Sequence, residues 1–257
     1  MNIKLDGEKL KIIEKSSIEA IIAESRIENS KDIMAVVIDN EVLGLNEQID
    51  RDAEIETVKI NSELGNRIYR RSLYLVMAKA VYELFPDSIL KIEISISNGI
   101  YCELENKSSL SKADLNKLKV RMQEIIDADH KIKKHILKKA EVLEILKNEN
   151  CTFRGELIEQ QDKDFYTLYE LDGYYDYFYY NMVPSTSYLR EFDLHLRIPG
   201  FVLLFPKFFS SKKVPKFKEQ PKLANIFLEY ERLGKILGVN NVVELNRVVE
   251  AKEYNEL

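Results

Sequence analysis

Histidine and cysteine, which serve as nucleophiles, general bases and zinc ligands, are rare in this chain. The 257 residues include three histidines and two cysteines. Cys102 falls on an apolar strand, and His195 is a lone histidine on a strand, a setting that is more often structural. The Gly-x-x-x-x-Gly-Lys-[Ser/Thr] loop that cradles a triphosphate is missing, since the residue five positions before Gly234-Lys235 is Glu229. We therefore expect no catalytic residue in this chain.

Two segments have compositions that also occur in nucleic-acid-binding surfaces. Residues 130–139, HKIKKHILKK, contain five lysines and two histidines. A solvated strand or loop face is favoured there over a phosphate-binding patch. Residues 165–180 contain nine aromatic residues in sixteen positions. Aromatic side chains stack on bases, but no basic residue is interleaved with them, so core packing and the lining of a cleft are favoured.

The elements that must position these residues follow from periodicity. Apolar residues recur at helical spacing in residues 65–86, and Pro86 ends that helix. Strand alternation follows from Leu90 to Ile96, and Asn98-Gly99 is expected to adopt the positive φ angles of a tight hairpin turn. A second helix begins at Ser111, with Asp114 completing a capping box. This pattern predicts an α+β core.

Residues 1–62 read as a smaller β-rich module. Two short strands, a helix capped by Ser17 and further strands succeed one another in the order of a ubiquitin-like β-grasp fold. Residues 62–65 join this module to the larger one, and Gly65 weakens regular structure there. We expect separately cored domains at 1–62 and 63–237, followed by a helical linker at 238–257.

Three segments of the larger module carry a resemblance, namely RRSLYLVMAKAVYELFP, SNGIYCEL and LSKADLNKLKVRMQEII. Together they resemble the editing domain of threonyl-tRNA synthetases, and residues 1–62 resemble the TGS domain that precedes it in that family. The family carries a His-x-x-x-His pair on the helix, which aligns with Arg71 and Leu75. Its Cys-x-x-x-His pair before Val-Pro aligns with Phe178 and Met182. The resemblance therefore implies the scaffold of an editing domain whose four polar site residues have been replaced.

These replacements remove the chemistry that the family's site would perform. Zinc requires nitrogen, sulfur or carboxylate ligands, and Arg71, Leu75 and Phe178 supply none. The thioether of Met182 is a soft ligand that cannot form a zinc site alone. None of the four side chains is a general base that would activate water. We expect neither a metal nor ester hydrolysis at this site.

The segments MVPSTSYL, FDL and PGFVLLFP carry a more specific resemblance, to the N-terminal region of bacterial nucleoside (uridine) kinases. This resemblance covers roughly residues 1–235. It implies a non-catalytic accessory or regulatory region of such a kinase, with ATP and Mg²⁺ used only by an attached P-loop domain. The alternative is a stand-alone synthetase-like protein that binds tRNA or hydrolyses mischarged tRNA. A purely structural role for both domains is a third reading.

The resemblance also places the two halves of the old site opposite each other, and this suggests a ligand-binding cleft. Such a cleft offers cations for an anionic ligand, hydroxyl groups for a sugar and aromatic faces for a flat ring, which suits a nucleoside or nucleotide. Alternatively, Arg71 pairs with a nearby carboxylate such as Asp176. The expected lining residues are Arg71, Tyr74, Lys79, Tyr179, Tyr180, Asn181, Met182, Ser185 and Thr186.

Composition places the protein among ordinary soluble globular proteins. Hydrophobic residues make up 45% and charged residues 32%, with a net charge of −5. The negative charge argues against a surface that binds nucleic acid over its whole extent. Two cysteines are too few for a disulfide framework, and neither a signal peptide nor a membrane span is visible. We expect a cytoplasmic protein that makes no membrane contact.

Overall fold

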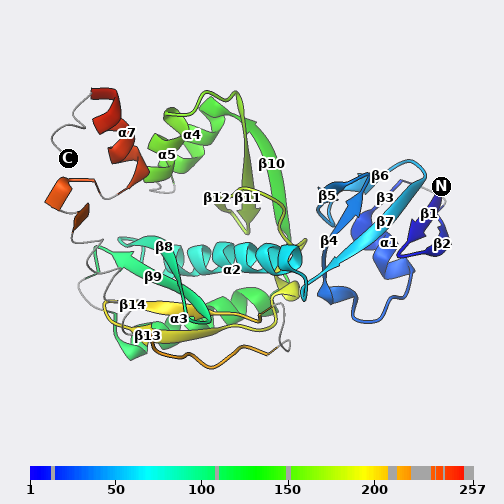
Figure 1. Ribbon diagram of the computed structural model, residues 1–257, viewed down its shortest axis with the longest axis horizontal. Coiled ribbons are helices and arrows are strands. Elements are labelled where there is room, and N and C mark those ends of the chain that lie inside the picture. The colour runs from blue at the N-terminus through cyan, green and yellow to red at the C-terminus, as the bar shows by residue number, and fades with distance from the viewer. Residues whose placement is uncertain are drawn as a thin grey trace.

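The computed structural model describes residues 1–12, 15–107, 110–148, 152–207, 213–220, 233–234, 236–239 and 241–251. It has the mixed α+β architecture expected from the sequence, with separate sheets arranged around one long central helix (Figure 1).

A five-stranded sheet forms the N-terminal module. Its order is β2-β1-β7-β4-β5, with β1 and β7 parallel and the other neighbours antiparallel. This is the β-grasp arrangement expected from the order of strands in the sequence. Helix α1 is capped by the Ser17 side chain, which accepts a hydrogen bond from the Ala20 N–H at 3.2 Å. The elements are β1 (Asn2–Leu5), β2 (Glu8–Lys11), β3 (Ser16–Ser17), α1 (Ile18–Glu24), η1 (Ser30–Asp32), β4 (Ile33–Ile38), β5 (Glu41–Leu43), β6 (Gln48–Ile49) and β7 (Ala53–Lys59).

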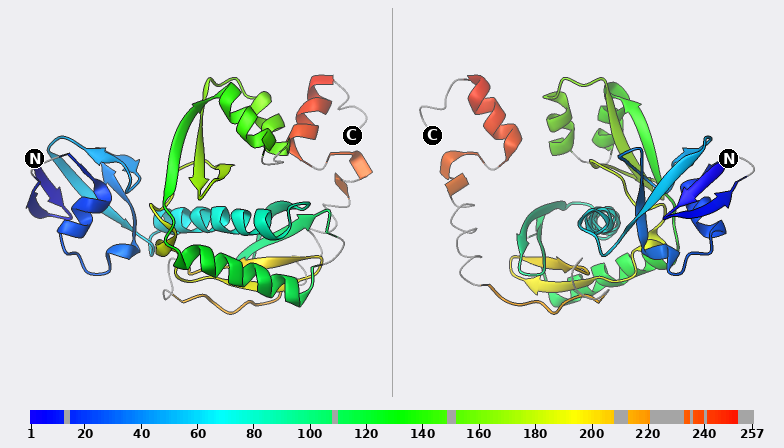
Figure 2. Two further views of the ribbon diagram at one scale, coloured as in Figure 1. Left: turned by 180° about the vertical axis from the view of Figure 1, so that it is seen from behind. Right: turned by 45° about the vertical axis from the view of Figure 1, so that its right-hand side comes forward.

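Helix α2 (Glu63–Leu84) is the central element of the larger module (Figure 2). Ser62 caps it by accepting a hydrogen bond from the Gly65 N–H at 3.0 Å. Gly65 therefore lies in the first turn of the helix and does not weaken regular structure, contrary to the sequence-based expectation. Its role is steric, since a Cβ atom at this position would overlap with the backbone oxygen of Lys59.

The four-stranded sheet β13-β14-β9-β8 packs beside α2 and α3, and Ser111 with Asp114 forms the expected capping box of α3. The hairpin turn lies one residue earlier than predicted, because Ser97 adopts the positive φ of 54°. Gly99 instead begins β9, where a Cβ atom would overlap with the Leu203 backbone oxygen of β14. The elements are β8 (Ile89–Ile96), β9 (Gly99–Glu105), α3 (Lys112–Asp127), η2 (Thr186–Tyr188), β13 (Asp193–Arg197) and β14 (Gly200–Leu204).

A three-stranded antiparallel sheet, β10-β11-β12, lies on the other side of α2 (Figures 1 and 2). Helices α4 and α5 cover its outer face, where Val142, Leu146 and Ile158 pack against Tyr166 and Leu168. The elements are β10 (Ile132–Lys138), α4 (Lys139–Asn148), α5 (Thr152–Glu159), β11 (Phe165–Leu171), β12 (Tyr174–Tyr177) and α7 (Val242–Ala251). Helix α7 falls in the expected C-terminal linker, of which residues 240 and 252–257 lie outside the described part.

Buried apolar side chains form one cluster that runs from the N-terminal sheet into the larger module. Ile3 and Ile55 of the sheet belong to the same cluster as Tyr69 and Leu73 of α2. The N-terminal module keeps a sheet of its own, and its buried side chains meet those of the larger module where α2 packs against β4 and β7. Within the described residues, no helix is both long and apolar enough to span a membrane.

The close contact at Gly65 predicts a strong effect of a single methyl group. Gly65→Ala should lower the free energy of unfolding by about 2–4 kcal/mol, because the methyl group meets backbone that cannot move independently. Gly44→Ala is the matched control, since its Cβ would lie 3.6 Å from the Asn181 side chain, an ordinary contact. Urea denaturation of both variants measures the difference. Equal stability of the two variants would contradict the steric role of Gly65.

Candidate functional site

Helix α2 and the loop of residues 178–186 lie against each other, as the resemblance implies. The contact is held by Ser72, which is fully buried. Its hydroxyl donates to the Ile68 carbonyl at 2.9 Å and accepts from the Val183 N–H at 3.0 Å. One side chain therefore satisfies a buried backbone donor in the loop and ties that loop to the helix.

The four positions that carry polar residues in the synthetase family are mostly apolar and packed here. Leu75 and Met182 are buried in the main core, and Phe178 packs against that core while partly exposed. Arg71 remains partly exposed, and partial burial together with the neighbouring Arg70 lowers its pKa. The described residues contain no group of three or more His, Cys, Asp or Glu side chains that could hold a metal ion.

Arg71 instead forms part of an aromatic surface. Its guanidinium lies 4.2 Å from the ring centroid of Tyr180, on one face of that ring. Tyr180 is 70% exposed and Tyr179 is 51% exposed. The ammonium of Lys163 lies 5.7 Å from the Tyr179 ring, and Tyr177 contacts Tyr179 edge-on at 5.0 Å. We call these five residues, Arg71, Lys163, Tyr177, Tyr179 and Tyr180, the aromatic shelf.

The alternative reading of Arg71, an ion pair with Asp176, is wrong. Asp176 is fully buried and pairs with Arg154 of α5, while also accepting from the Tyr177 N–H at 2.6 Å. Burial raises the pKa of Asp176, and the charge of Arg154 opposes that shift. The Asp176–Arg154 pair thus joins β12 to α5, while the guanidinium of Arg71 lies over the Tyr180 ring.

The structure does not bring all the expected lining residues into one cleft. Lys79 is only 5% exposed and pairs with Glu83 at 2.9 Å and Asp172 at 3.3 Å, so it joins α2 to the β11–β12 turn. Tyr74 packs against the core, and burial raises its pKa. Thr186 is buried and donates to the Ile125 carbonyl at 2.9 Å.

Ser185 also belongs to the scaffold of the loop. It is buried, and its hydroxyl lies 3.1 Å from that of Ser187, which in turn accepts a hydrogen bond from Lys31 of the N-terminal module. Tyr188 donates to Glu19 of α1 at 2.9 Å. The loop is therefore fixed by both modules, and Ser185 and Thr186 contribute to its position.

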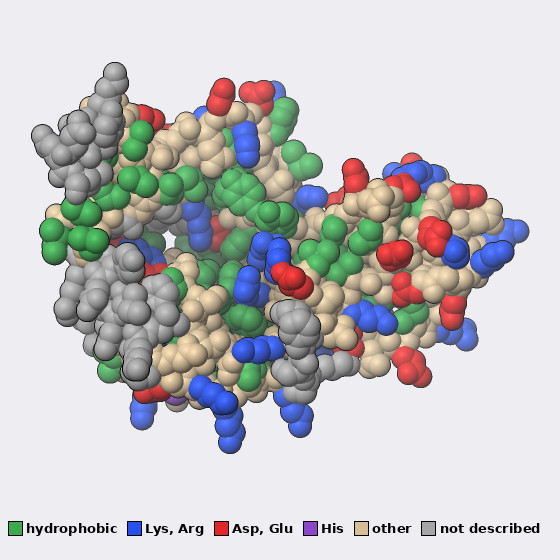
Figure 3. All heavy atoms as spheres, viewed as in Figure 1, with side chains coloured by type: hydrophobic (Ala, Val, Ile, Leu, Met, Phe, Trp, Pro, Cys, Tyr) green, Lys and Arg blue, Asp and Glu red, His purple; other side chains and the backbone are tan. Residues whose placement is uncertain are grey.

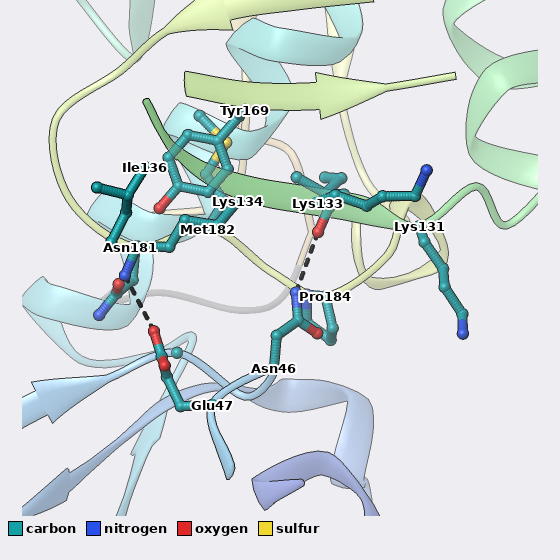
Figure 4. A pocket seen from close by; sticks show the side chains of 12 residues that line it. Asn46, Glu47, Lys131, Lys133, Lys134, Ile136, Tyr169, Asn181, Met182 and Pro184 are labelled. Carbon is teal, nitrogen blue, oxygen red and sulfur yellow. Dashed lines mark hydrogen bonds and ion pairs between the residues drawn. The ribbon is translucent and has the colours of Figure 1, made fainter. Parts of the chain in front are cut away.

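Asn181 and Met182 line a different space, a pocket of about 430 Å³ between the N-terminal module and β10 (Figure 4). Asn181 donates to the Val42 carbonyl at 2.8 Å, and Asn46 donates to the Ile132 carbonyl at 3.0 Å. The pair of Lys134 and Glu47, 2.9 Å apart, also spans the two modules. The pocket opens to solvent and has both apolar and charged walls.

Sequence reasoning missed two contributors to the site, Ser72 and Lys163. A serine within an amphipathic helix gives no signal that distinguishes a buried hydrogen-bonding role. Lys163 lies two residues before the aromatic segment of residues 165–180. Had that segment been extended by two residues, it would have included a basic residue. The other basic contribution, from Arg71, comes from a distant helix and was assigned only through the resemblance.

Removal of the Asp176 carboxylate should destabilise the protein more than removal of Arg71. Asp176→Ala should lower the free energy of unfolding by about 2–4 kcal/mol, because it breaks a buried ion pair whose Arg154 partner is only partly solvated. Arg71→Ala loses one cation–π contact and should cost less than about 1 kcal/mol. Thermal and urea denaturation of both variants test this order. A larger loss in Arg71→Ala would contradict the assignment of the buried pair.

The side chains at the inherited site also predict its metal content. With arginine, leucine, phenylalanine and methionine at these positions, purified protein should contain no stoichiometric zinc. Elemental analysis of protein dialysed without chelator measures this directly. A content of about one zinc per chain would contradict the prediction.

Comparison with known proteins supports the resemblance to threonyl-tRNA synthetases and adds nothing to the resemblance to nucleoside kinases. No family model matches the chain. It is 31% identical over 148 residues to a threonine–tRNA ligase of Finegoldia magna, covering 57% of this chain and 23% of that protein. It is 27% identical over 166 residues to the ligase of Clostridioides difficile, covering 64% and 26%. It is 26% identical over 196 residues to that of Clostridium kluyveri, covering 76% and 31%. The chain is thus similar to a region that spans about a quarter to a third of these threonine–tRNA ligases.

Proposed function

We propose that this chain binds the unpaired end of an RNA on the aromatic shelf and leaves its ester bonds intact. The observation that carries the proposal is the Arg71–Tyr180 contact, with one face of an exposed tyrosine ring against a cation. Single-stranded nucleic acids are bound by aromatic rings that stack on bases, combined with basic groups that attract the backbone. Arg71 and Lys163 supply the charge that the aromatic segment itself lacks.

The relatives support RNA as the ligand class. They are named threonine–tRNA ligases, so a tRNA end is a ligand of the proteins that this chain resembles. Hydrolysis is not part of the proposal, because Leu75, Phe178 and Met182 provide neither a metal ligand nor a general base. The scaffold would then retain recognition while the reactive groups have been replaced.

An accessory role in a nucleoside kinase is the second reading, and it rests on the sequence resemblance alone. It predicts that a free nucleoside or nucleotide occupies the shelf, since a single base would stack on Tyr180 in the same way. The comparisons add no support for a kinase. The two readings differ in ligand size, because a mononucleotide lacks the neighbouring phosphates that Lys163 would contact.

Binding of an RNA hairpin with an unpaired 3′ end, measured by fluorescence anisotropy, tests the proposal. Tyr180→Ala should weaken binding by about 1–3 kcal/mol, which is roughly tenfold or more. Arg71→Ala should weaken it as well, while Arg67→Ala, one turn earlier on α2, should not. Tyr82 lies on α2, outside the aromatic shelf. Tyr82→Ala is therefore the control for the loss of an exposed tyrosine that does not belong to the shelf.

Three further measurements separate the readings. A seryl ester on the RNA should persist in the presence of the protein, and rapid deacylation would contradict the non-hydrolytic assignment. A shift in melting temperature caused by uridine or its nucleotides, abolished in Arg71→Ala, would favour the nucleoside reading. RNA affinity that is equal in the parent protein, Tyr180→Ala and Arg71→Ala would remove the aromatic shelf as the binding site.

A further inference from the structure

Strand β10 forms the outer edge of its sheet on the side of the N-terminal module (Figure 1). It pairs with β11 without a register shift from Ile132 to Lys138. In an antiparallel pair, the backbone groups of alternate residues point to opposite edges. Ile132 N–H donates to the Pro184 carbonyl at 2.9 Å, away from β11, so the backbone groups of Lys134 and Ile136 point to this free edge too.

The beginning of this edge is already paired, and the rest is open. The loop at Pro184–Thr186 forms a short antiparallel bridge, in which Thr186 N–H donates to the His130 carbonyl at 2.9 Å. Asn46 then satisfies the Ile132 carbonyl. Among the described residues, no hydrogen-bond partner is present for the backbone groups of Lys134 and Ile136 that face this edge.

The open part of the edge borders the interdomain pocket. Lys134 and Ile136 form one wall, and Asn46 with Glu47 lies across from them (Figure 4). Ile136 is 67% exposed, so the open edge offers an apolar side chain to a partner. The surface is hollowed at this place between the two modules, with hydrophobic and basic side chains side by side (Figure 3). A strand continuing along the edge from the Pro184 bridge would enter this hollow.

The lysines along this edge favour a partner with negative charge. Lys133 pairs with Glu170 and Lys134 pairs with Glu47. Lys131 and Lys138 flank the open stretch and form no ion pair among the described residues. Lysines on an edge strand repel a second copy of the same strand. They attract an acidic segment instead.

We propose that β10 binds an acidic, extended peptide of a partner protein by β-strand addition at Lys134–Lys138. Backbone hydrogen bonds from Lys134 and Ile136 would supply affinity, as in other complexes formed at a sheet edge. The Ile136 side chain would contact an apolar residue of the peptide, and Lys131 and Lys138 would contact its carboxylates. This proposal does not depend on RNA binding at the aromatic shelf.

The test uses a labelled peptide of alternating Glu and Val, with a Lys and Val peptide as its charge-reversed control. The full chain should bind the acidic peptide and not the basic one. Ile136→Pro removes an outward N–H without removing a bond to β11, and should weaken binding by about tenfold or more. Ile136→Thr keeps that N–H and should weaken binding less.

A charge variant makes the result independent of how well the proline variant folds. Lys131→Glu combined with Lys138→Glu should invert the preference between the two peptides. Lys112→Glu combined with Lys117→Glu, on α3, is the matched control and should leave the preference unchanged. Absence of acidic-peptide binding by the parent chain would overturn the proposal. So would RNA binding that is lost in the β10 charge variant while neither peptide binds, since that result would assign the edge to RNA.

Discussion

The arrangement of the site depends on one buried hydroxyl group. Ser72 in the middle of α2 accepts the Val183 N–H and so fixes the loop that carries Tyr179 and Tyr180. Without this acceptor, the Val183 N–H would be buried and unsatisfied, at a cost of about 1–3 kcal/mol. The N-terminal module holds the same loop from its other side through Val42 and Glu19. The position of the aromatic shelf is therefore set jointly by the helix and by both modules.

Much of the fold follows from local sequence. The helix at α2, the strand at β8 and the capping box at Ser111 each depend on neighbours a few residues apart, and the structure has all three. Helix α2 is nevertheless buried on every side from Leu75 to Val81, and not on one apolar face alone. The errors concern contacts between one element and another. Gly65 and Gly99 lie where another segment of backbone approaches, and nothing near them in sequence reveals that approach. The contact between the two modules likewise depends on how α2 packs against β4 and β7.

The candidate site was predicted only in part, for the same physical reason. The family resemblance brought α2 and residues 178–186 together, but the partner of each side chain is decided by the tertiary structure. Lys79 was expected in the cleft because it shares a helix with Arg71, and it is buried against Asp172 instead. Asp176 forms its ion pair with Arg154, and Arg71 contacts the Tyr180 ring instead. The tyrosines of the shelf belong to one aromatic segment of the sequence, but the contact of that segment with Arg71 is made only by the tertiary structure.

The side chains at positions 71, 75, 178 and 182 favour packing and ring contacts over reaction. Histidine in a protein interior requires hydrogen bonds or a metal to offset its desolvation, and the loss of a metal would leave it without a partner. Leucine and methionine at positions 75 and 182 remove that requirement and fill the floor of the old site with packed apolar groups. The guanidinium of Arg71 and the rings of Tyr179 and Tyr180 lie at the solvent-exposed rim. A ligand would meet a surface suited to stacking there, and the groups that could break its bonds are no longer present at the four inherited positions.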